Sequence, residues 1–237
     1  MKKFFLTGEN ISYSLSPFIY NYLFKSYKIN AQYEVVENTI ASFPNFILNY
    51  QAGGYEGGNI TMPFKNMAKY LVLSEYSGES INLIYNNKGY NTDYLGIKNY
   101  FKIENKNILI LGYGGAGMAI AKALRDKNKV YIKNRRINED IGNNEIIINT
   151  TCCTMQGFDS KKLLENLNLS KTELVMDIVY NPIETELIKK ARDINIKTID
   201  GLNLLVWQAV ESFKIFCNID ASDKIEILYN MLKKICR

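Results

Sequence analysis

The chain has 237 residues, a formal net charge of +5 and no histidine, and 47% of its residues are hydrophobic. This length allows one large domain or two modest ones, with enough apolar residues for a core that needs no metal or disulfide. The absence of histidine excludes Ser-His-Asp and Cys-His nucleophiles and histidine-rich metal sites, and the dispersed, mild charge gives no indication of a nucleic-acid partner.

The first residues resemble the start of a secretory signal, but polar residues at positions 8–10 interrupt the apolar stretch too early. No apolar run approaches the roughly 20 residues that a membrane span needs. The four cysteines lack Cys-x-x-Cys spacing, which favours free thiols over a zinc site or disulfides. We therefore expect a cytoplasmic protein with no membrane partner and no metal. The cysteines are Cys152, Cys153, Cys217 and Cys236.

Short apolar runs alternate with helical stretches, a pattern typical of α/β proteins. A helix is expected to begin at Ser16-Pro17, because serine is a good N-cap and proline suits the first helical position. Ile19, Leu23 and Tyr27 then follow at helical spacing. In this first half, strands are expected at residues 3–7, 32–36, 58–61 and 81–86.

A second α/β region is expected to begin near residue 107 and to contain parallel βαβ units. A glycine-rich turn at residues 112–117 leads into an alanine-rich helix at about 118–125. After residue 201 the pattern becomes helical to the end, in two segments broken near 218–222. The strands of this region are expected at residues 108–111, 130–133, 145–149, 173–178 and 196–199.

The glycine turn predicts a dinucleotide site because it joins a strand to a helix. Gly112 permits the tight turn, and Gly114 lets the backbone approach a pyrophosphate, which the helix N-terminus would also attract. The alternative, a glycine-rich loop without a ligand, leaves the combination of strand, glycines and small-residue helix unexplained.

The residues after the next strand favour NADP over NAD. An NAD enzyme usually has an acidic residue there to hold the ribose 2′-hydroxyl. Here the strand ends in Asn134-Arg135-Arg136, and the nearest acids, Glu139 and Asp140, come later. A guanidinium can pair with a 2′-phosphate bidentately and stack on the adenine, although two arginines can also simply solvate a loop.

Several polar motifs occur in an order that resembles the shikimate dehydrogenase family, over nearly the whole chain. Besides the glycine turn and Asn134-Arg135, they are Ser14-Leu15-Ser16-Pro17, Asn59-Ile60-Thr61-Met62-Pro63-Phe64-Lys65, Asn91-Thr92-Asp93, Tyr180-Asn181-Pro182 and Gly201-Leu202-Asn203-Leu204-Leu205-Val206-Trp207-Gln208-Ala209. The resemblance implies NADP-dependent, reversible reduction of 3-dehydroshikimate to shikimate, in aromatic amino acid (chorismate) biosynthesis.

The resemblance also implies two domains with the active-site cleft between them. Residues 1–98 and 202–237 would form an α/β substrate domain that the C-terminal helices complete. Residues 99–201 would form a Rossmann-like NADP-binding domain. The expected assembly is a monomer or a homodimer.

By the same resemblance, Lys65 and Asp93 are the catalytic pair. The ammonium of Lys65 would stabilise the alkoxide that forms at C3 and supply its proton, and neutral Lys65 would take that proton in the oxidising direction. The expected substrate-binding residues are Ser14 and Ser16 for the carboxylate, Thr61, Asn82, Asp93 and Gln208 for the ring hydroxyls, and Tyr180 near the substrate and nicotinamide. The expected cofactor-binding residues are Gly112, Gly114, Gly115, Ala116, Asn134, Arg135, Arg136, Thr150, Ile178 and Gly201.

The chain departs from the family pattern at several positions. Tyr13 replaces a histidine, Leu83 a threonine and Tyr94 a glycine, and the 149–155 loop contains Cys152-Cys153. These departures leave open a quinate/shikimate dehydrogenase that uses NAD, or a catalytically weakened protein that binds shikimate or a nucleotide. An NAD(P)-linked enzyme of one-carbon folate metabolism would share the two-domain plan, but the Ser14/Ser16 pair and the Gln208-Ala209 ending favour the shikimate family.

Overall fold

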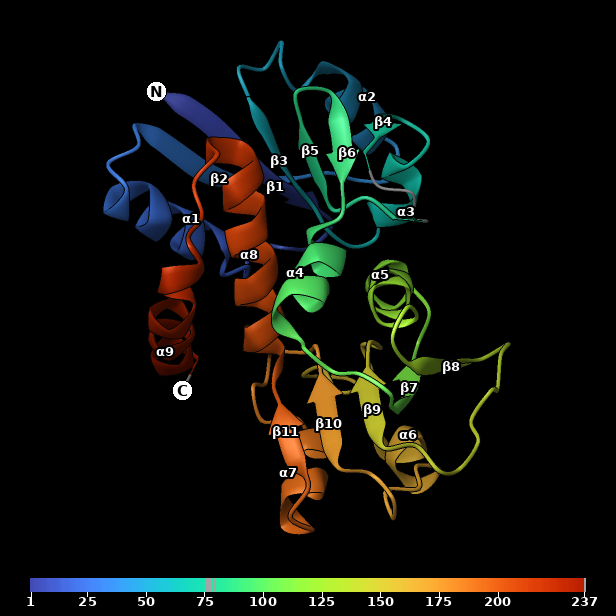
Figure 1. Ribbon diagram of the computed structural model, residues 1–237. Coiled ribbons are helices and arrows are strands. Elements are labelled where there is room, and N and C mark those ends of the chain that lie inside the picture. The colour runs from blue at the N-terminus through green and yellow to red at the C-terminus, as the bar shows by residue number, and fades with distance from the viewer. Residues whose placement is uncertain (76–77, 79, 237) are drawn as a thin grey trace. The chain divides into compact units, whose positions relative to one another are not determined.

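A computed structural model describes residues 1–75, 78 and 80–236. Contacts divide the chain into two compact units, each with its own sheet (Figure 1). Unit 1 contains Met1–Leu95 and Val206–Leu228, and unit 2 contains Gly96–Leu205 and Tyr229–Arg237. In the part of the chain that the structure describes, no helix is both long and apolar enough to cross a membrane.

The sheet of unit 1 is mixed, with six described strands in the order β2-β1-β3-β5-β6-β4. β1 is parallel to both β2 and β3, whereas β5 pairs antiparallel with β3 and β6. The strands are β1 (Lys2–Gly8), β2 (Ala31–Glu37), β3 (Gly57–Ile60), β4 (Leu73–Ser74), β5 (Leu83–Tyr85) and β6 (Lys88–Tyr90). The four strands expected in this half are confirmed, whereas β4 and β6 were not predicted. A two-residue turn, Asn86-Asn87 with φ of 50° and 60°, closes the β5–β6 hairpin, as expected for a turn with both central residues left-handed.

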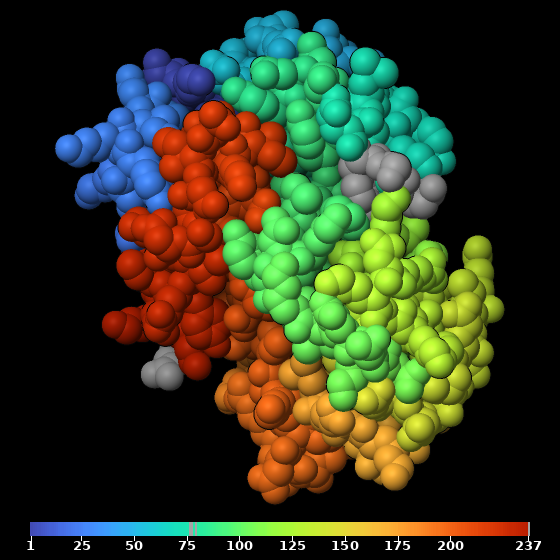
Figure 2. All heavy atoms as spheres, in the orientation of Figure 1, coloured from blue at the N-terminus to red at the C-terminus, as the bar shows by residue number. Residues whose placement is uncertain are grey.

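Helices cover both faces of this sheet. Consecutive strand residues point to opposite faces, so Phe4 meets the ring of Phe216 on α8 at 4.6 Å, while Phe5 meets Phe46 on α2 at 4.9 Å. In Figure 2 the C-terminal atoms (red) lie beside the N-terminal ones (blue), in agreement with the Phe4–Phe216 contact. The helices that contribute to unit 1 are α1 (Ser16–Ser26), α2 (Phe43–Asn49), α3 (Lys65–Ala68), the start of α4 (Thr92–Tyr100), most of α8 (Gly201–Cys217), the 3₁₀ turn η1 (Ser222–Lys224) and the start of α9 (Ile225–Ile235).

Helix α1 begins where expected, but Ser16 is not its N-cap. The cap position is Leu15, which makes no side-chain cap hydrogen bond. Instead, the Ser14 hydroxyl oxygen accepts a hydrogen bond from the Ser16 backbone N–H at 3.2 Å. The local hydroxyl–backbone interaction at this helix start therefore comes from Ser14, and the prediction was wrong because it considered only the residue next to proline.

Unit 2 has a parallel sheet whose five described strands run in the order β11-β10-β9-β7-β8. All five expected strands are confirmed. They are β7 (Asn107–Leu111), β8 (Lys129–Lys133), β9 (Ile146–Asn149), β10 (Leu174–Asp177) and β11 (Lys197–Ile199), and the helices between them are α5 (Gly115–Leu124), α6 (Lys161–Glu165) and α7 (Glu186–Asp193). The chain leaves β7 toward β8 on one side and returns to β9 on the other, so the strand order reverses at β7.

Candidate active site

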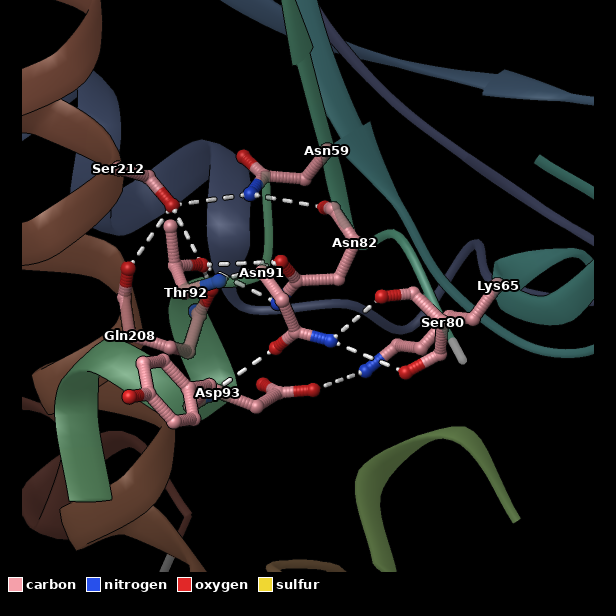
Figure 3. A network of polar contacts seen from close by, with 10 residues as sticks. Asn59, Lys65, Ser80, Asn82, Asn91, Thr92, Asp93, Gln208 and Ser212 are labelled. Carbon is pink, nitrogen blue, oxygen red and sulfur yellow. Dashed lines mark hydrogen bonds and ion pairs between the residues drawn. The ribbon is translucent and has the colours of Figure 1, made fainter. Parts of the chain in front are cut away.

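Lys65 and Asp93 form a close ion pair in unit 1. Lys65 is the first residue of α3 and Asp93 the second residue of α4. The Lys65 Nζ lies 2.5 Å from Asp93 Oδ2, and the two side chains are 16% and 6% exposed (Figure 3). A lysine held this way differs from the solvated surface lysines elsewhere in the chain, and it provides a proton donor next to a buried carboxylate.

Packing of the adjacent residue fixes the position of Lys65. Phe64 is fully buried and stacks on Phe43, with 4.3 Å between ring centroids. The Lys65 carbonyl also accepts a hydrogen bond from the Ile81 backbone N–H at 2.8 Å. The buried Phe64 ring and the hydrogen bond to the Lys65 carbonyl therefore hold the backbone at the lysine. The position of its ammonium thus depends on the packed core.

Behind this pair, a buried polar network joins α4, α8 and the central strands (Figure 3). Asn82 accepts a hydrogen bond from the Thr92 backbone N–H at 2.7 Å and donates one to the Thr92 hydroxyl at 3.1 Å. Thr92 Oγ1 lies 3.0 Å from Ser212 Oγ and 3.4 Å from Gln208 Oε1. Thr92 thus links two of the predicted substrate-binding residues, Asn82 and Gln208, next to Asp93.

Asn59 extends the network across the sheet. Its amide nitrogen donates to Ser212 Oγ at 3.0 Å, and its oxygen accepts from the Tyr33 hydroxyl at 2.8 Å. Tyr33 stacks on Tyr20 at 4.1 Å, and burial raises the pKa of both hydroxyls, so both stay protonated. Sequence reasoning did not identify Ser212, Tyr33 or Tyr20, because single hydroxyls within helical or strand patterns give no signal of their own.

Ser14, Ser16 and Thr61 occupy the carboxyl-end side of unit 1's parallel strands. Ser14 and Ser16 lie on the segment that enters α1 after β1, and Thr61 directly follows β3. The Thr61 backbone N–H donates to the Thr7 carbonyl at 2.8 Å, and a Cβ added at Gly8 would lie 2.5 Å from Thr61 Cγ2. Gly8 therefore allows Thr61 to pack directly on β1.

The glycine turn of unit 2 has the geometry that its sequence predicts. Gly112 has φ +93°, a conformation that side chains rarely adopt, and a Cβ there would lie 2.8 Å from the Thr150 hydroxyl oxygen. Gly114 is the N-cap of α5, and a Cβ there would meet nothing within 4 Å. Helix α5 begins at Gly115, three residues before the predicted start, so Gly115 and Ala116 lie in its first turn. The N-terminus of α5 is the positive end of its helix dipole, which suits an anionic group.

Asn134 organises the arginine segment after β8. Its side-chain oxygen accepts hydrogen bonds from the backbone N–H groups of Arg136 at 2.7 Å and Ile137 at 2.8 Å. Arg135 and Arg136 are exposed, and within residues 1–75, 78 and 80–236 neither guanidinium forms a salt bridge. Both are therefore available to an incoming phosphate.

The other predicted cofactor residues lie at the carboxyl ends of neighbouring strands in unit 2. The Thr150 hydroxyl donates to the Leu111 carbonyl at 2.8 Å, which holds it against the glycine turn. A Cβ added at Gly201 would lie 2.4 Å from the Ile178 carbonyl oxygen, so Gly201 and Ile178 are in direct contact. Tyr180 is half-buried and follows β10.

One buried carboxylate in unit 2 was not predicted. Asp177, the last residue of β10, is fully buried, and so is Asn149, the last residue of β9. Their side chains meet at 3.0 Å. Burial raises the pKa of the Asp177 carboxyl, while hydrogen bonds that it accepts from Val179 and Thr185 act in the opposite direction. Among the described residues, no cluster of His, Cys, Asp and Glu suited to a metal ion occurs.

Unit 2 has a parallel sheet with a glycine turn where the strand order reverses, which is typical of proteins that bind a dinucleotide. Unit 1 provides a paired lysine and aspartate suited to acid–base chemistry. Together these features are typical of an enzyme that uses a dinucleotide cofactor. Residues 6–84 match a family model described as the shikimate dehydrogenase substrate binding domain. The chain is 38% identical to the shikimate dehydrogenase (NADP(+)) of Saccharolobus islandicus, with 96% of this chain and 94% of that protein covered. It is 33% identical to the enzyme of the same name from Clostridium perfringens, over the whole of both chains.

The fold agrees with these relatives. A crystal structure of a shikimate dehydrogenase in complex with NADP+ matches with a TM-score of 0.86 and 29% identity, over 100% of this chain and 96% of that one. The chain belongs to the shikimate dehydrogenase family. The predicted family and fold class are confirmed.

Proposed function

We propose that this chain is an NADP-dependent shikimate dehydrogenase that reversibly reduces the C3 ketone of 3-dehydroshikimate to the hydroxyl of shikimate. This reaction serves the biosynthesis of chorismate and the aromatic amino acids. The observation that carries the proposal is the contact of 2.5 Å between Lys65 Nζ and Asp93 Oδ2, in a chain that has no histidine to act in their place. Membership of the family supports it independently.

When bound, NADPH supplies the hydride. The work of the protein is then to hold the substrate and to manage one proton. Lys65 stabilises the negative charge that develops on the C3 oxygen and donates the proton to it, and in the reverse direction its neutral amine accepts that proton. Asp93 orients the ammonium through the contact of its Oδ2 with Lys65 Nζ. The other lone pairs of the carboxylate can accept a hydrogen bond from a ring hydroxyl.

Substrate binding is assigned to polar groups of unit 1. Ser14 and Ser16 provide two hydroxyl donors for the carboxylate, at the start of α1. Thr61, Asn82 and Gln208 bind ring hydroxyls, and the fixed orientation of Asn82 against Thr92 supports this role. One residue of unit 2, Tyr180, is also assigned to the substrate and nicotinamide.

The residues of unit 2 fit the cofactor. The turn of Gly112, Gly114, Gly115 and Ala116 accepts the pyrophosphate, since its open backbone and the N-terminus of α5 favour an anion. Asn134, Arg135 and Arg136 hold the adenosine 2′-phosphate, and Thr150, Ile178 and Gly201 line the nicotinamide side. In this assignment residues 1–98 and 202–237 are the substrate domain, and 99–201 the NADP domain.

The proposal also includes a cytoplasmic location and action as a monomer or homodimer with small-molecule ligands alone. The cysteines at 152, 153, 217 and 236 are all free thiols, which is the usual state in a reducing compartment.

The decisive experiment follows NADP+ reduction at 340 nm with shikimate, beside parallel assays with quinate and with NAD+. We expect activity with shikimate and NADP+ to exceed each alternative. Replacing both Arg135 and Arg136 with alanine should lower kcat/KM for NADP+ about 10- to 100-fold while leaving NAD+ nearly unchanged, because only NADP+ carries the 2′-phosphate. Preference for quinate and NAD+ in the wild-type protein would refute the assignment, and would favour the quinate/shikimate alternative.

A further inference from the structure

The loop at residues 150–155 forms a wall of the nucleotide site of unit 2. It follows β9, which pairs with β7 at the point where the strand order reverses. Ligands of open parallel sheets bind outside the carboxyl ends of the strands at such a point. A Cβ added at Gly117 would lie 2.7 Å from Thr150 Oγ1, and one at Gly112 only 2.9 Å from Thr151 Cγ2. The loop therefore touches both the glycine turn and the first turns of α5.

A single buried amide ties both ends of this loop together. The Asn149 side-chain nitrogen donates to Thr154 Oγ1 at 3.0 Å, and its oxygen accepts from the Thr151 hydroxyl at 2.7 Å and from the Thr151 backbone N–H at 3.1 Å. Thr154 is itself buried, whereas Cys152 between them is exposed. The amide thus closes the loop on itself and leaves its tip to solvent.

Asp177 fixes the orientation of that amide. Its Oδ1 accepts from Asn149 Nδ2 at 3.0 Å and from the Val179 backbone N–H at 3.1 Å, and its Oδ2 accepts from the Thr185 hydroxyl at 2.8 Å. A hydrogen bond with the Thr154 side chain also acts to lower its pKa, and within the described residues Asp177 forms no salt bridge. Because a carboxylate can only accept, the Asn149 nitrogen must face Asp177 and the Asn149 oxygen must face Thr151.

We propose that Asp177 is a positioning residue of the nucleotide site, which sets the 150–155 loop against the glycine turn by fixing the side-chain amide of Asn149. The inference rests on the proposed function, since it assigns a role at the same cofactor site. Asp177 is buried at the end of β10 and acts through Asn149. Its effect is preorganisation: a loop already ordered around Thr150 does not lose conformational freedom when the nucleotide binds.

The test measures NADP+ binding by calorimetry, together with kcat and both KM values. Asn149→Asp places a second carboxylate 3.0 Å from Asp177 Oδ1, and Asp177→Ala removes the acceptor. Both should raise the Kd for NADP+ about tenfold or more, with the KM for shikimate changed less than about twofold. Thr154→Val, which removes one hydroxyl that both Asn149 and Asp177 contact, is a milder change and should raise that Kd about threefold.

Asp177→Asn is the conservative rescue. Its remaining oxygen can still accept from Asn149 and Val179, and its amide can donate to Thr185, so the Kd should stay within about threefold of wild type. Glu145→Gln is the matched control. Glu145 accepts a hydrogen bond from Lys106 Nζ at 2.8 Å and lies just before β9, at the amino ends of the strands, whereas Asn149 and Asp177 lie at the carboxyl ends. It should leave the Kd unchanged. Circular dichroism melting curves identify the temperature at which every variant is folded.

The outcomes separate the inference from the proposed function. A Kd raised about tenfold in Asn149→Asp and Asp177→Ala, with at most a threefold rise in Asp177→Asn and no change in Glu145→Gln, would support the positioning role. Wild-type affinity in folded Asn149→Asp and Thr154→Val would overturn it while leaving the dehydrogenase assignment intact. A wild-type protein that does not bind NADP+ would overturn both.

Discussion

Replacing Lys65 with methionine tests whether the ion pair acts in catalysis, in stability or in both. Methionine keeps an unbranched side chain of similar length but has no ammonium, so Asp93, only 6% exposed, loses its cation. Removing one partner of a fully buried pair costs about 3–5 kcal/mol. Because Lys65 is 16% exposed and water can reach it, we expect the free energy of unfolding to fall by about 2–4 kcal/mol.

The loss of activity should be larger and should not follow stability. Loss of a general acid typically lowers the rate about 10²- to 10⁴-fold, and stabilisation of the alkoxide is lost as well. The double variant Lys65→Met/Asp93→Asn removes both charges, so it should recover to within about 1 kcal/mol of wild-type stability. Its kcat should nevertheless stay as low as that of Lys65→Met, because residues that act as a unit are not additive in catalysis.

Urea unfolding gives the stabilities of wild type, Lys65→Met, Asp93→Asn and the double variant, and the NADP+ reduction assay gives kcat and KM for each. The reasoning would be refuted if Lys65→Met kept more than about a tenth of wild-type kcat at saturating substrate. It would also be refuted if the double variant regained activity together with stability, since the pair would then be structural.

Further predictions concern other parts of the two units. Gly112→Ala places a Cβ at φ +93°, and should lower the free energy of unfolding by about 1–3 kcal/mol and weaken NADP+ binding about tenfold; calorimetry showing wild-type affinity would contradict this. Ser14→Ala removes the acceptor of the Ser16 N–H, and should raise the KM for shikimate about tenfold while the KM for NADP+ is unchanged; equal changes in both would argue against a carboxylate site. Hydrogen bonds from Lys106 and the backbone lower the pKa of Glu145 below its ordinary 4.5, so its contribution to stability is present above about pH 4.5 and is lost as the pH falls through the lowered pKa. The difference in unfolding free energy between wild type and Glu145→Gln should therefore shrink from pH 7 to pH 3 in urea titrations, and a constant difference would contradict the assignment.

The sequence predicts the strands of the parallel sheet in unit 2 well because they are short apolar runs between clear turns. The three inner strands β7, β9 and β10 are the clearest cases, since burial on both faces makes each run nearly continuous in apolar residues. β4 and β6 could not be predicted because Leu73–Ser74 and Lys88–Tyr90 are too short to show periodicity. The Asn86-Asn87 turn carried the available signal for the β5–β6 hairpin, since asparagine tolerates positive φ.

The candidate site divides in a similar way. Lys65 and Asp93 could be proposed because their motifs are distinctive, and the structure brings their side chains together. Asp177 and Ser212 could not be proposed from the sequence. Asp177 lies in a strand and Ser212 in a helix, and the apolar pattern of each element gives no indication that one polar residue has a role at the site. Their roles depend on which side chain of a distant segment they meet, such as Asn149 or Asn59, and periodicity gives no information about such pairs.

Helix α8 has a consequence for how this chain can be divided. Its first residues belong to unit 2, and the rest, from Val206, to unit 1, where Ser212 and Gln208 provide partners for Asn59 and Thr92. A fragment that ends at Leu95 would contain the six described strands of the first sheet, yet it would leave Asn59 and Thr92 without Ser212. It would also expose the ring of Phe4 that Phe216 covers. The N-terminal half should therefore complete its folding only after the ribosome has synthesised α8.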